Sequence, residues 1–316
     1  MDIQTVNSIL RAFKIKGECA SISEDLYVKS YDFILNVGTK LNAISKISPE
    51  ISMCLREKAK PNIHYLYSEG IVRFEYVKCL PQSNTIDNLN YKNLECFIGK
   101  DLYNKDVVFD IKSAPNTIVA GTTGSGKSKL LQALIINLVS QGIYTWIIDP
   151  KQIDFSSFQK YDNISISSSY EEAHSVLDYF IHSMNHNYEV IKNTSSKYIS
   201  PQVLIIDEFN DLLVQDYDNT LKNKIIKLSQ KCRAAHIYMI LATQRPSTDV
   251  ICGTIKANFP ARICCRTASA IDSRIVLGTS GAENLHGAGD ALLLDNHNNM
   301  RRFQVSYTTE QDILSL

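Results

Sequence analysis

Apolar residues in the C-terminal two thirds of the chain form short β-branched runs that alternate with longer stretches of helical periodicity. The strand-type runs cover 116–120, 144–149, 203–207, 237–242 and 261–266. Helical spacing fills 129–141, 171–192 and 219–234. Strands that alternate with helices favour a parallel sheet with helices on both faces. We therefore predict an α/β domain over residues 96–316.

The first 95 residues show a different pattern. Apolar residues at helical spacing open the chain, and a helix is predicted over 47–60. Strand-type runs cover 31–37, 62–67 and 71–77. This mixture predicts a small α+β domain over residues 1–95. The polar, turn-rich stretch 81–93 is the predicted linker.

A glycine-rich loop joins the first predicted strand of the α/β domain to its first helix. The segment VAGTTGSGKSKLL at 119–131 fits the pattern G-x-x-x-x-G-K-[ST]. Glycines let backbone N–H groups converge on phosphate oxygens, and the following helix directs its positive end at the same anion. The sequence thus predicts a P-loop NTPase with a RecA-like sheet. The predicted nucleotide-binding residues are Gly121, Thr122, Thr123, Gly124, Ser125, Gly126, Lys127, Ser128 and Lys129.

Two acids close the apolar run at 203–206. Strands buried on both faces have this composition, and their polar ends emerge at the carboxyl edge of the sheet. In a P-loop protein, Asp207 and Ser128 would hold Mg²⁺, while Lys127 would contact the β- and γ-phosphates. Glu208 would deprotonate the attacking water. We therefore expect ATP and Mg²⁺ as cofactors and ATP hydrolysis as the activity.

Another apolar strand, at 240–242, ends in Thr243 and Gln244. In many P-loop ATPases the neighbouring strand carries a polar residue that senses the γ-phosphate, and Gln244 is the catalytic candidate here. The alternative is an ordinary turn at the end of a strand.

The composition of the chain limits how it could bind polyanions, form disulfides or cross a membrane. The net charge is zero, so any polyanion contact needs a local patch, and residues 222–274 hold ten Lys or Arg against two acids. The eight cysteines include no C-x-x-C pair and are expected to be reduced thiols in a cytoplasmic protein. Adjacent Cys264 and Cys265 should point to opposite faces of a strand. No apolar run approaches the length of a membrane span.

These motifs resemble the motor of the FtsK/SpoIIIE family of DNA translocases. The similar segments are VAGTTGSGKS at 119–128, IIDPK at 147–151, IIDEFNDL at 205–212, QKCRAAHIYMILATQRPSTDVICGTIKANFPARI at 230–263 and SAIDSRIVLGTSGAENLHGAGDALL at 269–293. The resemblance implies a homohexameric ring threaded by double-stranded DNA, with ATP bound between subunits. It makes Arg233 the arginine finger of the neighbouring site. It also makes Arg245, Lys256 and Arg274 the candidate DNA contacts.

The chain departs from the family pattern in a few places. Ala270 stands where the family usually has a basic residue, and Asn210 replaces an alanine. The sequence carries no recognisable membrane domain and no winged-helix γ domain. We therefore expect a free motor, such as that of a plasmid, phage or integrative element. The alternatives are a coupling ATPase that serves a mobile element or secretion channel, a protein-secretion ATPase of the same family, and a non-enzymatic scaffold.

Overall fold

The computed structural model describes residues 2–57, 61–193 and 199–316, which form two compact units. The first unit comprises Met1–Pro81 together with Leu102–Asn104, and the second comprises Gln82–Asp101 and Lys105–Leu316. The predicted boundary at residue 95 therefore differs from the division in the structure. The reason is backbone pairing: the Tyr307 N–H donates to the Ser83 carbonyl at 2.9 Å, so the predicted linker packs with the second unit.

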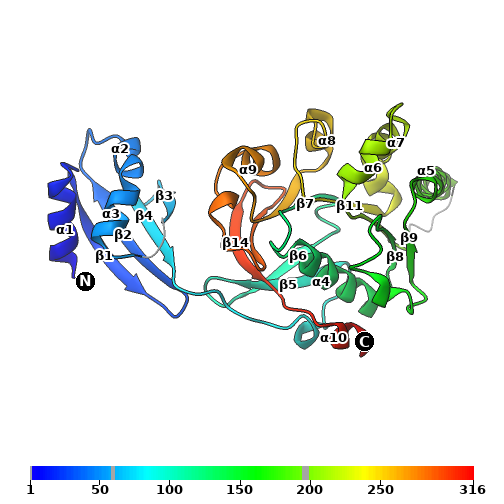
Figure 1. Ribbon diagram of the computed structural model, residues 1–316, viewed down its shortest axis with the longest axis horizontal. Coiled ribbons are helices and arrows are strands. Elements are labelled where there is room, and N and C mark those ends of the chain that lie inside the picture. The colour runs from blue at the N-terminus through cyan, green and yellow to red at the C-terminus, as the bar shows by residue number, and fades with distance from the viewer. Residues whose placement is uncertain (1, 58–60, 194–198) are drawn as a thin grey trace. The chain divides into compact units, whose positions relative to one another are not determined.

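In its described residues, the first unit consists of a four-stranded antiparallel sheet and three helices (Figure 1). Its core gathers large side chains that include Leu10, Tyr31, Phe33 and Phe74. The strand order is β1-β2-β4-β3, so β1 and β3 are the edge strands of this sheet. The elements are α1 (Ile3–Ala12), β1 (Gly17–Glu24), β2 (Val28–Leu35), α2 (Leu41–Lys46), α3 (Ser48–Cys54), β3 (Asn62–Leu66) and β4 (Ile71–Val77).

The second unit is built on a ten-stranded mixed sheet with the order β6-β5-β14-β13-β12-β7-β11-β10-β8-β9. The six strands from β12 to β9 are parallel. Five of them match predicted strands, whereas β9 was not predicted. The other four strands are antiparallel, which the sequence did not indicate. The strands are β5 (Glu95–Asp101), β6 (Asp106–Asp110), β7 (Asn116–Ala120), β8 (Tyr144–Ile148), β9 (Ile164–Ser167), β10 (Gln202–Ile206), β11 (Ile237–Thr243), β12 (Ala261–Cys265), β13 (Asp290–Leu294) and β14 (Met300–Val305).

Helices cover both faces of this sheet, which confirms the predicted α/β class (Figure 1). One face packs against α4 (Lys127–Ser140) and α10 (Glu310–Leu314). The other face packs against α5 (Tyr170–Asn193), α6 (Phe209–Gln215), α7 (Thr220–Ser229), α8 (Gly253–Asn258) and α9 (Ala270–Leu277). Short 3-10 turns are η1 (Ile86–Asn88), η2 (Ser156–Phe158), η3 (Cys232–Ala235) and η4 (Ala282–Asn284).

Burial on both faces explains the continuous apolar composition of the central strands. In β10, Val203 and Ile205 face the α4 side, while Leu204 and Ile206 face the opposite core. Cys264 and Cys265 likewise divide between the two cores, as predicted for adjacent strand residues. All eight cysteines are free thiols. Within the described parts of the chain, no helix has both the length and the apolar character that crossing a membrane demands.

Candidate functional site

The glycine-rich loop lies at the carboxyl edge of the sheet, between β7 and α4. α4 begins at Lys127, directly after Gly126, whose φ of 104° lies in the left-handed region. A Cβ at Gly126 would come within 2.4 Å of the Gly289 nitrogen. Glycine is therefore required at this position. The first turn of α4 presents N–H groups that have no partner within the helix, and these favour an anion.

Neighbouring loops hold the glycine-rich loop in shape. The N–H groups of Ala288 and Gly289 donate to the carbonyls of Gly124 and Ser125, at 3.2 and 2.8 Å. The Thr122 N–H donates to the carbonyl of Arg266 at 2.9 Å. Because several backbone groups of the loop are bound to the segments after β12 and before β13, its conformation is set before any ligand arrives.

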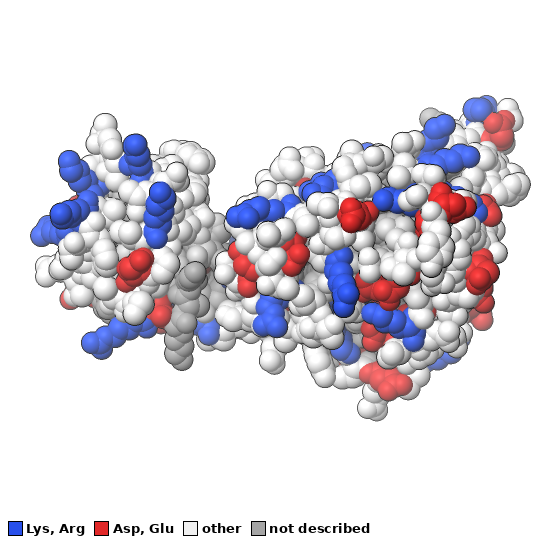
Figure 2. All heavy atoms as spheres, turned by 45° about the horizontal axis from the view of Figure 1, so that its top comes forward, with Lys and Arg blue, Asp and Glu red and all other residues white. Residues whose placement is uncertain are grey.

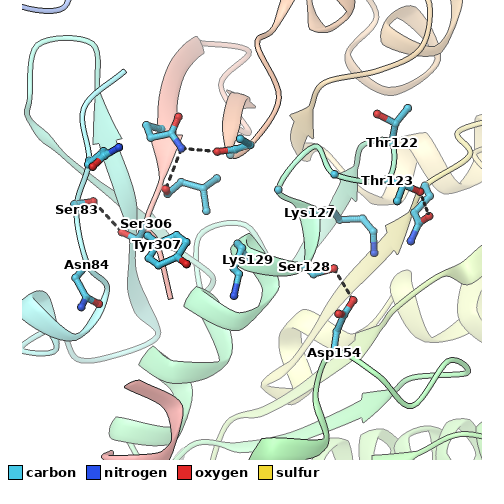
Figure 3. Close-up of a pocket in the computed structure, with 18 residues that line it drawn as sticks. Ser83, Asn84, Thr122, Thr123, Lys127, Ser128, Lys129, Asp154, Ser306 and Tyr307 are labelled. Atoms are coloured by element: carbon cyan, nitrogen blue, oxygen red, sulfur yellow. Dashed lines mark hydrogen bonds between the residues drawn. The ribbon is translucent and has the colours of Figure 1, made fainter. Parts of the chain in front are cut away.

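Beside this loop lies a cavity of about 960 Å³ (Figure 3). Its size suits a small-molecule ligand of nucleotide dimensions. Its lining comes from the loop itself, from Asp154 after β8, from Gln244 after β11, from Ala288 and Gly289 before β13, and from the segments at 82–84 and 304–307. Among the predicted nucleotide-binding residues, the cavity is lined by Thr122, Thr123, Gly124, Gly126, Lys127, Ser128 and Lys129.

Lys127 and Asp207 form a buried salt bridge at the carboxyl edge of the sheet. Their side chains are 3% and 2% exposed, so neither charge has water to stabilise it. A buried pair of this kind depends on both partners, because removal of one leaves an uncompensated charge. The structure thus places the predicted phosphate-binding lysine against the predicted metal-binding acid.

Glu208 is buried in an unusual backbone conformation. Its φ of 53° is left-handed, which costs a non-glycine residue on the order of 1 kcal/mol. The carboxylate accepts hydrogen bonds from Thr243 Oγ1 at 3.1 Å and from the Gln244 N–H at 3.1 Å. Lys151 Nζ lies 3.6 Å from Glu208 Oε2. Two neighbouring segments, the end of β11 and the loop after β8, therefore hold the predicted base in place.

The order of the strands explains why Gln244 joins the site. β11 lies between β7 and β10, so its carboxyl end emerges between the glycine-rich loop and Glu208. Gln244 lines the cavity, and its Oε1 accepts a hydrogen bond from Thr123 Oγ1 at 2.9 Å. Gln244 thereby bridges the loop and the acid. The role of Gln244 in sensing the γ-phosphate stays a prediction.

Ser128 has a partner that the sequence did not reveal. Its Oγ donates to Asp154 Oδ2 at 2.6 Å, as Figure 3 shows. The Asp154 carbonyl accepts from Gln132 Nε2 of α4 at 2.9 Å, which fixes the loop after β8 against the helix. A serine that ligates a metal through a lone pair needs an acceptor for its proton. Asp154 is placed to be that acceptor.

The oxygen atoms around Ser128 suit Mg²⁺. Ser128, Asp207 and Asp154 are hard oxygen donors, and the nearby Asp149 carboxyl is buried, with Oδ2 unpartnered among the described residues. Burial raises the pKa of Asp149, and the charge of Asp207 adds to this effect. No three His, Cys, Asp or Glu side chains form a metal cage in the described ranges. Mg²⁺ sites that share a substrate phosphate need only one or two protein carboxylates.

We expect Asp154→Asn to weaken the contribution of Mg²⁺ to nucleotide binding. Partners of metal ligands typically contribute 10- to 100-fold to metal affinity, so we expect a loss of roughly tenfold. Nucleotide affinity in EDTA should stay equal or rise, because a negative charge near the phosphates is removed. Titration of a fluorescent ATP analogue with and without Mg²⁺ measures both quantities. Asp162→Asn, an exposed acid in the following loop, is the control. Equal losses with and without Mg²⁺ would contradict this role.

The polar side chains of three other residues of the loop are either bonded to other parts of the protein or buried. Thr122 Oγ1 donates to the Arg266 carbonyl at 3.1 Å. Ser125 is buried, and its Oγ has no partner among the described residues. Lys129 Nζ donates to the Thr308 carbonyl at 2.6 Å and to Gln132 Oε1 at 3.1 Å. The Lys129 ammonium is therefore held by the C-terminal segment.

Arg233 lies on η3, immediately before β11, and is exposed. The glycine-rich loop follows the carboxyl end of β7, which is parallel to β11. Seven residues of β11 at about 3.3 Å each place Arg233 roughly 20 Å from that edge. Arg233 therefore lies at the opposite edge of the sheet from the site of its own chain.

The three candidate DNA contacts lie on or beside the helices of one face. Arg245 follows β11 and is exposed, Lys256 is half-buried on α8, and Arg274 is exposed on α9. Burial and the charge of Arg262 lower the pKa of Lys256. Arg262 itself donates to the carbonyls of Phe259, Lys256 and Val276, so it has a structural role. Figure 2 shows Lys and Arg side chains in separate clusters, with acids between them.

The fold and this site define a P-loop ATPase, and comparison with known proteins narrows the class. Residues 83–202 match the FtsK/SpoIIIE family. The DNA translocase FtsK of Borreliella burgdorferi is 31% identical over 97% of this chain, and the match covers 43% of that protein. The DNA translocase SftA of Bacillus subtilis is 28% identical over 98% of this chain and 36% of its own length. The chain is therefore similar to proteins of the FtsK/SpoIIIE family, as its motifs predicted.

Solved structures share the fold over most of the chain. The pCW3 conjugation coupling protein TcpA, in its monomer form with ATPγS, matches with a TM-score of 0.70 and 20% identity over 99% of this chain and 98% of that chain. The type VII secretion ATPase EccC of Thermomonospora curvata matches with a TM-score of 0.60 and 22% identity over 75% of this chain and 31% of that chain. The chain spans less than half the length of the curated relatives it matches.

Proposed function

We propose that this chain is the motor of a double-stranded DNA translocase, which hydrolyses ATP at the interfaces of a homohexameric ring. One observation carries this proposal. Lys127, which lines the cavity, and the buried acids Asp207 and Glu208 lie at one edge of the sheet, and the exposed Arg233 lies at the other. Among the described residues, no arginine lines this cavity, while the same chain presents Arg233 at the far edge of the sheet. This arrangement suits catalysis shared between adjacent copies.

The residues of the site have distinct roles in the proposed reaction. Lys127 would turn from Asp207 to the β- and γ-phosphates of ATP, supported by the N–H groups at the start of α4. Bound Mg²⁺, held by Ser128 and Asp207, would neutralise phosphate charge. Glu208 would accept the proton of the attacking water, and Gln244 would report the state of the γ-phosphate to β11. Arg233 of the neighbouring copy would stabilise the charge that develops in the transition state.

The distribution of basic residues supports a shared grip on DNA. One copy carries zero net charge and separate basic clusters on the viewed face, so a single chain offers few phosphate contacts (Figure 2). Several copies around one duplex would add their contacts together, because linked weak sites act at high effective concentration. Contacts to backbone phosphates do not read sequence, which suits a motor that moves along any duplex.

Long duplex DNA is expected to stimulate ATP hydrolysis by the wild-type protein, and Arg274→Ala should reduce that stimulation. Arg274→Ala should also weaken binding equally on two unrelated duplexes and reduce the salt slope by roughly one, because one phosphate contact is lost. Ala270→Lys should have the reverse effect on affinity. Lys112→Ala, an exposed lysine before β7, is the control. Salt-titrated binding and sedimentation on the same samples make the measurement.

Two outcomes would contradict this proposal. If Arg274→Ala binds DNA as the wild type does while the assembly stays intact, Arg274 is not a DNA contact. If wild-type hydrolysis ignores duplex DNA altogether, the translocase proposal fails, and the protein-secretion alternative becomes the better account of the same ATPase site.

A further inference from the structure

The cavity beside the glycine-rich loop extends beyond the residues that would bind phosphates. One end is formed by Thr123, Gly124 and Lys127, and the other by the segments 82–84 and 304–307 (Figure 3). Its volume of about 960 Å³ is near the upper end of the usual range for small-molecule sites. The phosphates of ATP would occupy the loop end. The second end is therefore available for the remainder of the nucleotide.

The wall at this second end is held together by its own hydrogen bonds. The Tyr307 N–H donates to the Ser83 carbonyl at 2.9 Å, and the hydroxyls of Ser83 and Ser306 lie 3.1 Å apart. The Ser306 N–H donates to the Ile98 carbonyl of β5 at 3.0 Å. These contacts fix the backbone of both segments, so the wall is formed before a ligand binds.

The Tyr307 ring is the large aromatic surface on this wall. Its side chain is 64% exposed, although its backbone is anchored on both sides. Lys129 Nζ lies 5.7 Å from the ring centroid and is itself fixed by the Thr308 carbonyl and Gln132 Oε1. The ring is thus oriented from one side and open to the cavity. An exposed, fixed aromatic ring in a ligand cavity is suited to stacking against a planar group.

We propose that Tyr307 is the stacking platform for the purine base of the bound nucleotide, with the segment 82–84 as the adjacent wall. The proposal rests on the proposed ATPase function and assigns the part of the site that the phosphate-binding residues leave open. Stacking of a base on an aromatic side chain is largely indifferent to the identity of the base. Tyr307 would therefore give affinity for nucleotides over inorganic phosphates, with little discrimination between purines.

Competition binding with ATP and inorganic tripolyphosphate separates the two ends of the cavity. Tyr307→Ala should weaken ATP binding roughly tenfold and leave tripolyphosphate binding unchanged, because loss of one stacked aromatic removes only the contact with the base. Tyr307→Phe should retain the affinity for ATP. The fluorescence of Tyr307→Trp should be quenched by ATP and by adenosine but not by tripolyphosphate. Tyr217→Ala, a 92% exposed tyrosine on another loop, is the control.

Four other outcomes would contradict the proposed base site. Wild-type affinity for ATP in Tyr307→Ala would overturn the proposal, because the base would then bind elsewhere. Equal losses for ATP and tripolyphosphate would also overturn it, since Tyr307 would then only shape the cavity. If the wild-type protein binds tripolyphosphate but not ATP, the base site fails while the phosphate site stands. If it binds neither ligand, the proposed ATPase function fails, and the base site fails with it.

Discussion

Glu208→Gln protein is expected to bind ATP as the wild type does and to hydrolyse it at least about 100-fold more slowly, because general-base catalysis contributes 10²- to 10⁴-fold. Glutamine has nearly the same size, and its Oε1 can still accept from Thr243 Oγ1 and the Gln244 N–H. The buried environment is therefore preserved. What is lost is the capacity to take a proton from the attacking water.

The measurement combines steady-state ATP hydrolysis with ATP-analogue binding on the same preparation. Asp211→Asn is the matched control, because Asp211 lies three residues later, is 44% exposed and also contacts Lys151, at 3.9 Å. It should hydrolyse ATP at close to the wild-type rate. A thermal melt checks that both variants are folded. Hydrolysis by Glu208→Gln at the wild-type rate would show that another group is the base.

Arg233→Ala is expected to bind ATP normally and to hydrolyse it roughly 10³-fold more slowly, because an arginine finger contributes 10³- to 10⁵-fold. The arginine lies at the edge of the sheet opposite to its own site, so its loss should leave nucleotide binding intact. Lys231→Ala is the control, since this exposed lysine lies two residues earlier on the same segment.

Mixing two inactive proteins tests whether Arg233 acts on a neighbour. In equal mixtures of Arg233→Ala and Glu208→Gln, about one interface in four pairs an intact Glu208 with an intact Arg233. Hydrolysis should then rise well above that of either protein alone. If it does not rise although labelled subunits are seen to exchange, the site is not shared between copies. Glu208→Gln is preferred here to Lys127→Ala, which would leave Asp207 buried without its partner.

The central strands could be predicted from the sequence because burial leaves a strong pattern. β10 is apolar from Val203 to Ile206, since helices cover both of its faces. β1 was missed because only Cys19 of its residues is buried, so its polar composition shows no alternation. β14 was missed because its composition, which includes Arg301 and Arg302, also shows no alternation of apolar and polar residues. Its charges pair with Asp101 and Asp290, and such pairing leaves no periodic pattern.

The helix predicted over 47–60 extends beyond the helix that the structure shows. α3 ends at Cys54, and Arg56 adopts a left-handed φ of 58°, which a helix cannot continue through. Residues 58–60 of that prediction lie outside the described residues. The apolar spacing had given no indication of this early end.

The candidate site was predictable only where its residues belong to a motif. Lys127, Asp207 and Glu208 follow strands in recognisable patterns, and the structure brings them to one edge of the sheet. Asp154 was missed because it lies in a loop, five residues after the strand-end acid Asp149. The wall at 82–84 was interpreted as a linker. Backbone hydrogen bonds build that wall, and they leave no mark on the side-chain sequence.

The separation of Arg233 from the glycine-rich loop, at opposite edges of one sheet, has a consequence for symmetry. If the arginine of one copy completes the site of another, the interface joins two different surfaces and cannot obey a two-fold axis. Such head-to-tail contacts either close into a ring or continue as a filament. In an open chain, the last copy always has a site without an arginine and an arginine without a site. Closure removes both defects at once, so all the nucleotide sites of an assembly are complete only in the closed form.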